Sequence, residues 1–256
     1  MKTQSKAYIY ALLAVAFWST IATAFSLALN ELDVFQLMTG ASFVAVICLT
    51  IILKIQGNLG FLTKLKSKDL LHSAGLGFLN PFLYYVVLLK AYTILPAQEA
   101  MALNYMWPIS LVLLSVVILK QKISWKSLLS ILISFIGVIV IGTRGKLLDF
   151  TFTDWYGDLL AIGSSVIWAL FWIFNMKDKR NESEKLFLNF FFGFFYLLIG
   201  TLFFSEFKIP EANGVFAVVY IGLFELGITF FLWMKALSFS SSTDKVSQLA
   251  FLSPFL

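Results

Sequence analysis

The sequence contains few residues that bind metals or form covalent cross-links. It has one cysteine, Cys48, and one histidine, His72, among 256 residues. A single cysteine cannot form a disulfide within the chain, and a zinc site needs several Cys or His ligands. The sequence also lacks a phosphate-binding loop, a Gly-x-Ser-x-Gly elbow and a pair of aspartates inside an apolar run. We therefore expect no metal, no cofactor and no enzymatic activity.

Charged residues are scarce as well. Only 13% of the residues are Asp, Glu, Lys or Arg, whereas 60% are apolar and 17% are aromatic. The mean hydropathy is +0.88. A soluble domain carries about 25% charged residues. Because half that share cannot cover the surface of a chain this large, we expect most of the surface to face lipid.

The basic residues stand in short clusters between long apolar runs. The net charge is +5, but no basic face is interleaved with aromatics, so we expect no nucleic-acid partner. If each apolar run crosses a bilayer, fifteen Lys and Arg fall on one side and four on the other. Positive residues collect in cytoplasmic loops, which predicts a cytoplasmic N-terminus. We interpret the other loop charges, including Arg144, Asp149, Asp154 and Asp158, as topological or solvated. The larger basic group is Lys2, Lys6, Lys54, Lys64, Lys66, Lys68, Lys120, Lys122, Lys126, Lys177, Lys179, Arg180, Lys185, Lys235 and Lys245, and the smaller is Lys90, Arg144, Lys146 and Lys208.

Apolar runs of a length that spans a membrane follow one another along the chain. A bilayer core about 30 Å thick needs roughly 20 residues of helix, and eight runs approach that length. A ninth run, Val246–Leu256, is too short to cross. The eight expected spans are Ala7–Ala28, Val34–Leu53, Leu70–Leu89, Ala97–Leu119, Trp125–Ile141, Gly157–Phe174, Leu186–Phe204 and Phe216–Leu237.

Three pairs of segments recur in the same order about 145 residues apart. This pattern predicts two copies of a five-span unit, over residues 1–146 and 147–256, with the second copy incomplete by the last helix or so. An odd number of spans per copy places the two copies in opposite orientations in the membrane, as in many secondary transporters. The pairs are Ala11 and Trp18 with Ala161 and Trp168, Gly77 and Lys90 with Gly222 and Lys235, and Pro108 with Pro254.

These spans, with a proline midway along the fourth, resemble the EamA family of the drug/metabolite transporter superfamily. Two stretches, Phe17-Trp18-Ser19-Thr20 and Asn104-Tyr105-Met106-Trp107-Pro108, are similar to the YddG group of aromatic amino acid exporters. The resemblance implies a bacterial inner-membrane protein with ten helices around a central cavity, which releases amino acids or related metabolites by alternating access. The chain departs from that pattern by ending before a tenth helix, so an inactive fragment stays an alternative.

Glu225 is the one acidic residue deep inside an expected span. A charge facing lipid at the centre of a helix costs at least about 2.5–3.5 kcal/mol, so this side chain should face a cavity or be protonated. One interpretation is contact with a substrate ammonium group or a role in proton coupling. The other is a buried acid hydrogen-bonded between helices.

A second candidate group surrounds Pro108. Proline leaves the carbonyl one turn earlier, at residue 104, without its helical partner, and such backbone is tolerated at membrane depth only where protein or water satisfies it. Asn104, Tyr105 and Trp107 could hold an amphipathic ligand there. A kinked packing helix explains the same residues.

Further candidates come from the repeat. Trp18 and Trp168 occupy matching positions in midspan. One interpretation is that they form a cavity wall, and the one we favour is that they pack between the copies. Asn80 aligns with Glu225, which makes Asn80 and Tyr84 candidate cavity residues or supports of a kink at Pro81. Ser164 and Ser165 are expected to be packing residues.

Two lysines also match in the repeat. Lys90 and Lys235 lie at opposite ends of the third and eighth spans. We expect both to extend toward the membrane surface, and a site for a carboxylate at each cavity mouth is the alternative.

Together, these patterns predict an all-α polytopic carrier built from two inverted five-helix repeats. We expect it to export a small amphipathic metabolite, an aromatic or other neutral amino acid. Efflux of a wider range of metabolites or of cationic drugs is the alternative within this class, and a channel is less compatible with the repeat. The expected partners are a small-molecule substrate and the lipid bilayer, with the chain a monomer or a homodimer.

Overall fold

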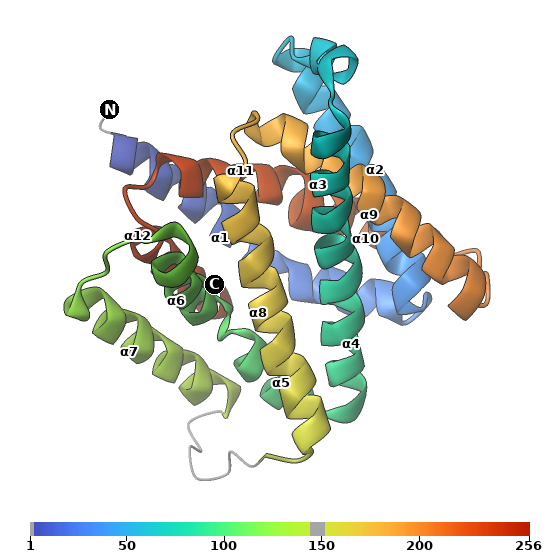
Figure 1. The fold of residues 1–256 in the computed structure, drawn as a ribbon. Helices are drawn as coiled ribbons and strands as arrows, with labels where there is room; N and C mark the ends of the chain where they lie inside the picture. Colours follow the sequence, from blue (N-terminus) through green and yellow to red (C-terminus); the bar gives the residue numbers. More distant parts are fainter. Residues whose placement is uncertain (1–2, 144–151) are drawn as a thin grey trace.

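The computed structural model describes residues 3–143 and 152–256, and every regular element in these ranges is a helix. Lys2, Arg144, Lys146 and Asp149 lie outside the described residues, as does the predicted boundary between the two repeats. Figure 1 shows the arrangement. The elements are α1 (Thr3–Leu29), α2 (Val34–Ile55), η1 (Leu59–Lys64), α3 (Ser67–Gly77), η2 (Phe78–Leu83), α4 (Tyr84–Ile94), α5 (Ala97–Asn104), α6 (Trp107–Leu119), α7 (Trp125–Gly142), α8 (Trp155–Lys177), α9 (Glu182–Phe204), α10 (Ala212–Ile221), η4 (Gly222–Gly227), α11 (Ile228–Phe239), α12 (Asp244–Ser247) and η5 (Gln248–Phe255).

Seven helical segments of the described chain are long and apolar enough to cross a membrane. Each corresponds to a predicted span, although several extend further: the third span runs over Ser67–Ile94 through α3, η2 and α4. The predicted fifth span forms α7, whose apolar part, Trp125–Val140, is shorter. The segment after residue 243 folds as the short helices α12 and η5. The prediction of an all-helical polytopic membrane protein is confirmed.

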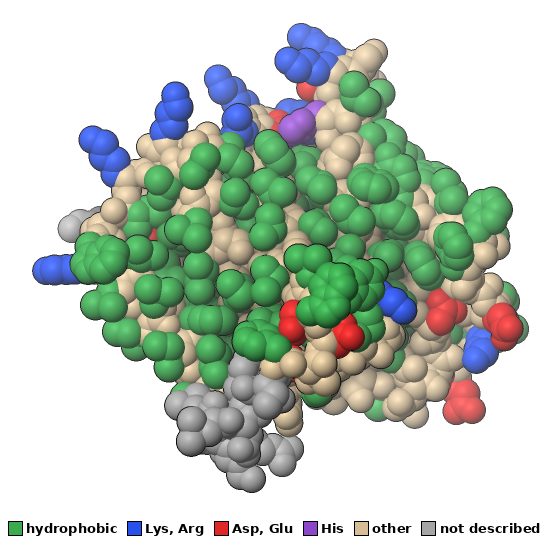
Figure 2. Space-filling model, turned by 60° about the horizontal axis from the view of Figure 1, so that its bottom comes forward, with side chains coloured by type: hydrophobic (Ala, Val, Ile, Leu, Met, Phe, Trp, Pro, Cys, Tyr) green, Lys and Arg blue, Asp and Glu red, His purple; other side chains and the backbone are tan. Residues whose placement is uncertain are grey.

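The surface matches a membrane environment. Figure 2 shows hydrophobic side chains over the middle of one face, with most Lys and Arg along one edge and most Asp and Glu toward the opposite edge. Many large apolar side chains on this exterior are exposed, among them Val117, Leu202 and Phe203 at 74–77%. Such exposure is unfavourable in water and expected against lipid.

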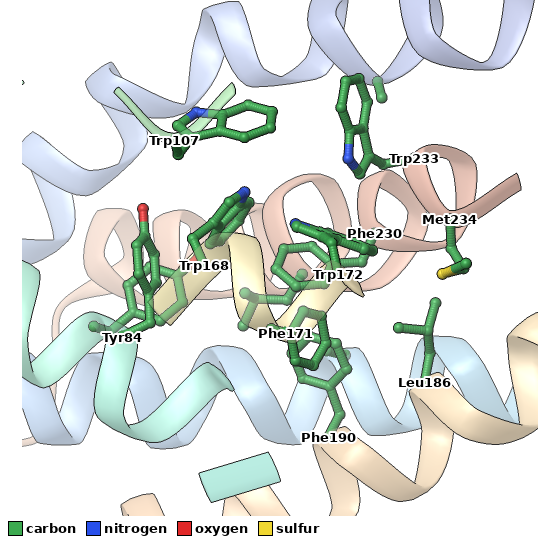
Figure 3. Packing of buried hydrophobic residues seen from close by; sticks show 14 of the residues in the cluster. Tyr84, Trp107, Trp168, Phe171, Trp172, Leu186, Phe190, Phe230, Trp233 and Met234 are labelled. Carbon is green, nitrogen blue, oxygen red and sulfur yellow. The ribbon is translucent and has the colours of Figure 1, made fainter. Parts of the chain in front are cut away.

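Helices from distant parts of the chain pack together. α1 packs against α11, α2 against α9, and α8 against both α4 and α6, and α4 and α8 lie side by side in Figure 1. Large aromatic side chains fill the interior where α8, α9 and α11 meet, and Trp172, Phe190 and Phe230 are fully buried (Figure 3).

Three spans are broken near their middles. The third and the last widen into a π-type turn at η2 and η4, and the fourth is interrupted at Tyr105 and Met106 between α5 and α6. At η2, Pro81 packs directly on α9, where an added Cβ at Gly193 would lie 2.2 Å from its Cδ atom. At η4, an added Cβ at Gly222 would lie 2.6 Å from the carbonyl oxygen of Ala41 on α2. Glycine is required at both contacts because a Cβ atom would overlap with the Pro81 ring at the first and with the backbone of α2 at the second.

One loop charge was predicted wrongly. Asp158, interpreted as a topological or solvated loop charge, is a buried residue in the first turn of α8. α5 packs against this part of the molecule and places the carboxyl group of Glu99 beside Asp158. Tertiary packing therefore covers a residue whose local sequence is typical of an exposed helix start.

Candidate functional site

A cavity of about 600 Å³ lies between α1, α4 and α5, and residues of α6, α8, η4 and η5 line its inner end, the end nearer the middle of the spans. Its wall is mainly aromatic and aliphatic. Seven of the eight predicted site residues line it, namely Trp18, Tyr84, Asn104, Tyr105, Trp107, Trp168 and Glu225, and the wall also includes Ile21, Ala22, Phe25, Ser26, Leu29, Tyr85, Leu88, Leu89, Tyr92, Ala97, Gln98, Met101, Ala250 and Ser253.

Glu225 is the charged residue among those that line the cavity. It lies in the π-type turn of η4 and is 7% exposed. The hydroxyl group of Tyr85, on α4, donates a hydrogen bond of 2.7 Å to Oε1 of Glu225. The side chain of Trp18 is a second hydrogen-bond partner of this carboxyl group. Because a carboxylate has about four acceptor positions, others are left for a ligand in the cavity.

Asn104 connects three helices at the break in the fourth span. Its Nδ2 donates to Oγ of Ser164 on α8 at 2.9 Å, and the Tyr84 hydroxyl on α4 approaches its Oδ1 at 3.4 Å. Ser164 in turn donates to the carbonyl oxygen of Ala161 at 2.6 Å. Because α5 ends at Asn104, this side chain stands at the interruption that Pro108 predicts, and the serine that we expected only to pack also orients it.

Tyr105 forms the neighbouring part of the wall. Its hydroxyl group donates to Oγ of Ser253 in η5 at 3.2 Å. The contact joins the fourth span to the last described segment of the chain, two regions that both contain a proline, Pro108 and Pro254.

Four tryptophans meet at the inner end of the cavity. Trp18, Trp107, Trp168 and Trp233 come from α1, α6, α8 and α11, and the contacting ring centroids are 5.0–6.2 Å apart. Figure 3 shows Trp107, Trp168 and Trp233 facing one another. Trp18 and Trp168 therefore line the cavity and also pack between helices, so the two interpretations of these residues describe one arrangement. Edge-to-face and tilted contacts of this kind stabilise aromatic clusters.

Asn80 does not reach the cavity. Its side chain is fully buried, and it is not among the cavity-lining residues. In a regular helix Asn80 and Tyr84 would share a face, but Asn80 has φ −152° and ψ 125°, which are not helical values. This extended residue turns the Asn80 side chain away from the face that Tyr84 presents.

The cavity extends toward one face of the membrane. It is lined by Leu29 at the end of α1, Tyr92 near the end of α4, and Ala97 and Gln98 at the start of α5. These three helix ends lie on the side that holds the smaller predicted group of basic residues.

On the opposite face the helix ends are joined by polar contacts. Lys235 Nζ lies 2.7 Å from Oε2 of Glu182, connecting α11 to α9. Arg180 contacts Asp178 and also donates to Oγ of Ser73 on α3 at 2.8 Å. Burial raises the pKa of Asp178, but hydrogen bonds from Arg180 and the nearby positive charges outweigh it, so the pKa lies below its usual range.

Several residues of the site were not predicted as such. Tyr85 stands beside the predicted Tyr84, but a neighbour in a helix points about a quarter-turn away, so nothing local indicates its bond to Glu225. Ser253 and Phe25 have no local signal at all. Among the described residues, no group of three or more His, Cys, Asp and Glu side chains could hold a metal ion.

Comparison with known proteins agrees with this architecture. The chain is 26% identical over 248 residues to an uncharacterized transporter of Clostridium kluyveri, covering 93% of this chain and 78% of that protein. It is 26% identical over 246 residues to the uncharacterized transporter YetK of Bacillus subtilis, covering 93% and 73%. A solved structure, described as the crystal structure of a protein, has a TM-score of 0.82 at 20% identity and covers 98% of this chain and 85% of its own, which indicates the same fold.

The model of the EamA-like transporter family matches residues 5–143 and 155–256. These ranges include every cavity-lining residue. The protein is therefore a multi-pass membrane transporter that belongs to the EamA-like transporter family.

Proposed function

We propose that this transporter exports small amphipathic metabolites that carry an ammonium group, and that Glu225 binds that group. The observation that carries the proposal is a cavity of about 600 Å³ with a mainly aromatic and aliphatic wall and Glu225 as its acidic lining residue. A carboxylate in a buried site attracts a cation, and flat aromatic faces bind an apolar body. Aromatic or other neutral amino acids are the first candidate substrates, supported by the resemblance of the Asn104–Pro108 stretch to the YddG group.

A second candidate class is cationic amphiphiles without a carboxylate. The same observation favours it, because Glu225 can bind an ammonium group and no described lining residue brings a positive charge to a carboxylate. Both classes predict dependence on Glu225.

We further propose that the protein lies in a bacterial inner membrane with its N-terminus in the cytoplasm and works by alternating access. The distribution of Lys and Arg supports this orientation. The two breaks, η2 at Phe78–Leu83 and η4 at Gly222–Gly227, stand about 145 residues apart, which supports two inverted repeats over residues 1–146 and 147–256. In this orientation the cavity extends toward the outside of the cell, as a carrier in its outward-facing state would require.

Transport into proteoliposomes tests the proposal. We expect the parental protein to exchange labelled phenylalanine or the permanently charged trimethylated phenethylamine, and Glu225→Gln to lose at least about 90% of that exchange because the counter-charge is gone. Glu206→Gln, an exposed position in the α9–α10 connection, removes the same charge outside the cavity and should exchange at the parental rate.

Both variants must elute as monodisperse proteins for the comparison to count. If a well-folded Glu225→Gln variant transports both probes at the parental rate, Glu225 does not bind the substrate and the proposal fails.

A further inference from the structure

The described lining of the cavity contains an acidic side chain that can bind a substrate's ammonium group but no basic side chain that can bind a carboxylate. Among the described residues that line it, Glu225 is the one Asp, Glu, Lys, Arg or His side chain. The two lysines considered as carboxylate partners lie elsewhere. Lys90 is exposed and does not line the cavity, and Lys235 is paired with Glu182 at 2.7 Å.

Several hydrogen-bond donors of the inner cavity already have acceptors, whereas the indole N–H of Trp168, a lining residue, has none. The hydroxyl group of Tyr85 donates to Glu225, that of Tyr105 donates to Ser253, and the amide of Asn104 donates to Ser164. At the break between α5 and α6, the backbone amides of Tyr105 and Met106 donate to the carbonyl oxygens of Met101 and Leu103.

A zwitterionic amino acid would therefore bring a carboxylate into a site whose described lining residues offer it neutral donors, such as the Trp168 indole, but no positive charge. The carboxylate stands on the same carbon as the ammonium group, so binding of the latter at Glu225 places the former close to a second negative charge. Burying an unpaired charge costs several kcal/mol, and a nearby like charge adds to that cost. An amine of the same shape avoids both penalties.

We propose that the cavity selects aromatic monoamines that lack a carboxylate over the amino acids with the same side chain. This inference rests on the proposed function, because it takes Glu225 as the ammonium site. It narrows the substrate to a net cation, such as the product of amino acid decarboxylation.

Equilibrium binding to the purified parental protein tests the selection without interference from passive leakage of amines. Labelled phenethylamine is displaced by four unlabelled compounds: phenethylamine, phenylalaninamide, phenylalanine and 3-phenylpropionate. Phenylalaninamide is the matched control, since it has nearly the shape of phenylalanine and keeps the ammonium group but carries no carboxylate.

We expect phenethylamine and phenylalaninamide to bind at least about tenfold more tightly than phenylalanine, and 3-phenylpropionate not to compete, because only the last two bring an unpaired carboxylate. If phenylalanine binds within about threefold of phenylalaninamide, the inference is wrong while the proposed function stands. If none of the four compounds binds, or if Glu225→Gln binds phenethylamine normally, the proposed function itself fails.

A positive charge added to the cavity provides the converse test. Ser26 is exposed and lines the cavity on α1, two turns after Trp18. Side chains of a helix lean toward its N-terminus, so the ammonium group introduced by Ser26→Lys can reach back toward the inner end.

We expect Ser26→Lys to reduce the ratio of the affinities for phenylalaninamide and phenylalanine by at least about fivefold. Ser26→Met, which adds similar bulk without charge, should leave this affinity ratio unchanged. An unchanged affinity ratio in a folded Ser26→Lys variant would mean that the missing positive charge is not the cause of the weak binding of phenylalanine.

Discussion

The hydroxyl group of Tyr85 and the carboxyl group of Glu225, 140 residues apart in the chain, meet at 2.7 Å. Tyr85 is the second residue of α4, directly after the break at η2, and Glu225 lies within the break at η4. The one acid of the cavity thus stands where two interrupted helices face each other. Interrupted helices mark substrate sites in carriers because their ends can move as units.

Tyr85→Phe should destabilise the unliganded protein more than the liganded one. The substitution keeps the ring and removes the donor to a buried carboxyl group, and a hydrogen bond to a charged group contributes about 1.5–3 kcal/mol. A bound ammonium group replaces part of the lost interaction. We therefore expect a Tm several degrees below the parental value that recovers in part with saturating phenethylamine.

Tyr105→Phe is the matched control for this measurement. It removes a hydroxyl group that donates to a neutral partner, Ser253, at 3.2 Å, so a smaller loss of about 0.5–1.5 kcal/mol is expected. Equal losses in the two variants would mean that the Tyr85 hydroxyl makes no special contribution to Glu225.

Gly193→Ala should disrupt the contact between α9 and the break at η2. The added methyl group would lie 2.2 Å from Cδ of Pro81, and overpacking of this kind costs typically about 1–3 kcal/mol. We expect a lower Tm and a smaller share of monodisperse protein. Gly163→Ala in α8 is the control, because a Cβ there meets nothing within 4 Å and alanine favours a helix. A parental Tm for Gly193→Ala would show that the two backbones can separate without cost.

The features that could be predicted from the sequence depend on local pattern. Long apolar runs predict the spans. A single acid within one of them, Glu225, predicts polar surroundings because a lone charge is costly in lipid. Pro108 predicts an interrupted helix, and α5 ends at Asn104 as expected.

The remaining features depend on contacts between distant segments. Tyr85 finds Glu225 through the packing of the whole bundle, and Asp158 is buried by α5 rather than by its neighbours in sequence. Whether Asn80 or Tyr84 faces the cavity is decided by the dihedral angles of one residue at a break. Repeat alignment placed Asn80 opposite Glu225 in sequence, but matching positions need not present matching side chains.

Asn104→Ala and Ser164→Ala should not be additive. Each variant removes one partner of the 2.9 Å hydrogen bond between α5 and α8 and leaves the other without it. A double-mutant cycle on Tm should give a coupling of about 1 kcal/mol, typical of a buried hydrogen bond between neutral groups. Additive effects would mean that the two side chains act independently.

Asp178→Asn should lower stability at neutral pH but have little effect in acid. The pKa of Asp178 lies below its ordinary value because the interactions with Arg180 and the nearby positive charges outweigh burial. A depressed carboxyl pKa stabilises the folded protein above the ordinary value of 3.8, and this stabilisation is lost as the pH falls through the folded-state pKa.

The measurement is Tm from pH 7 downward. At pH 7 we expect Asp178→Asn to melt about 3–6 °C below the parent, with the difference shrinking below the ordinary carboxyl pKa. Glu206→Gln, which makes the same change in net charge at an exposed position, should show neither effect. A difference for Asp178→Asn that does not change with pH would contradict the electrostatic origin.

Aqueous access to the inner cavity can be read from single cysteines on α1. Ala22 lines the cavity one turn after Trp18, whereas Thr23, at nearly the same depth, is exposed on the exterior and is not among the cavity-lining residues. The native Cys48 is buried and should give little background. Thiols react with maleimides as thiolates, which form in water and not in lipid. In intact cells, a membrane-impermeant maleimide should therefore modify Ala22→Cys and leave Thr23→Cys unmodified.

Lys179→Cys, on the predicted cytoplasmic face, should react only after permeabilisation. Modification of Lys179→Cys from outside would reverse the proposed orientation, and an Ala22→Cys variant as inert as Thr23→Cys would mean that the cavity is closed to the outer face, so that a substrate held at Glu225 could not leave by that route.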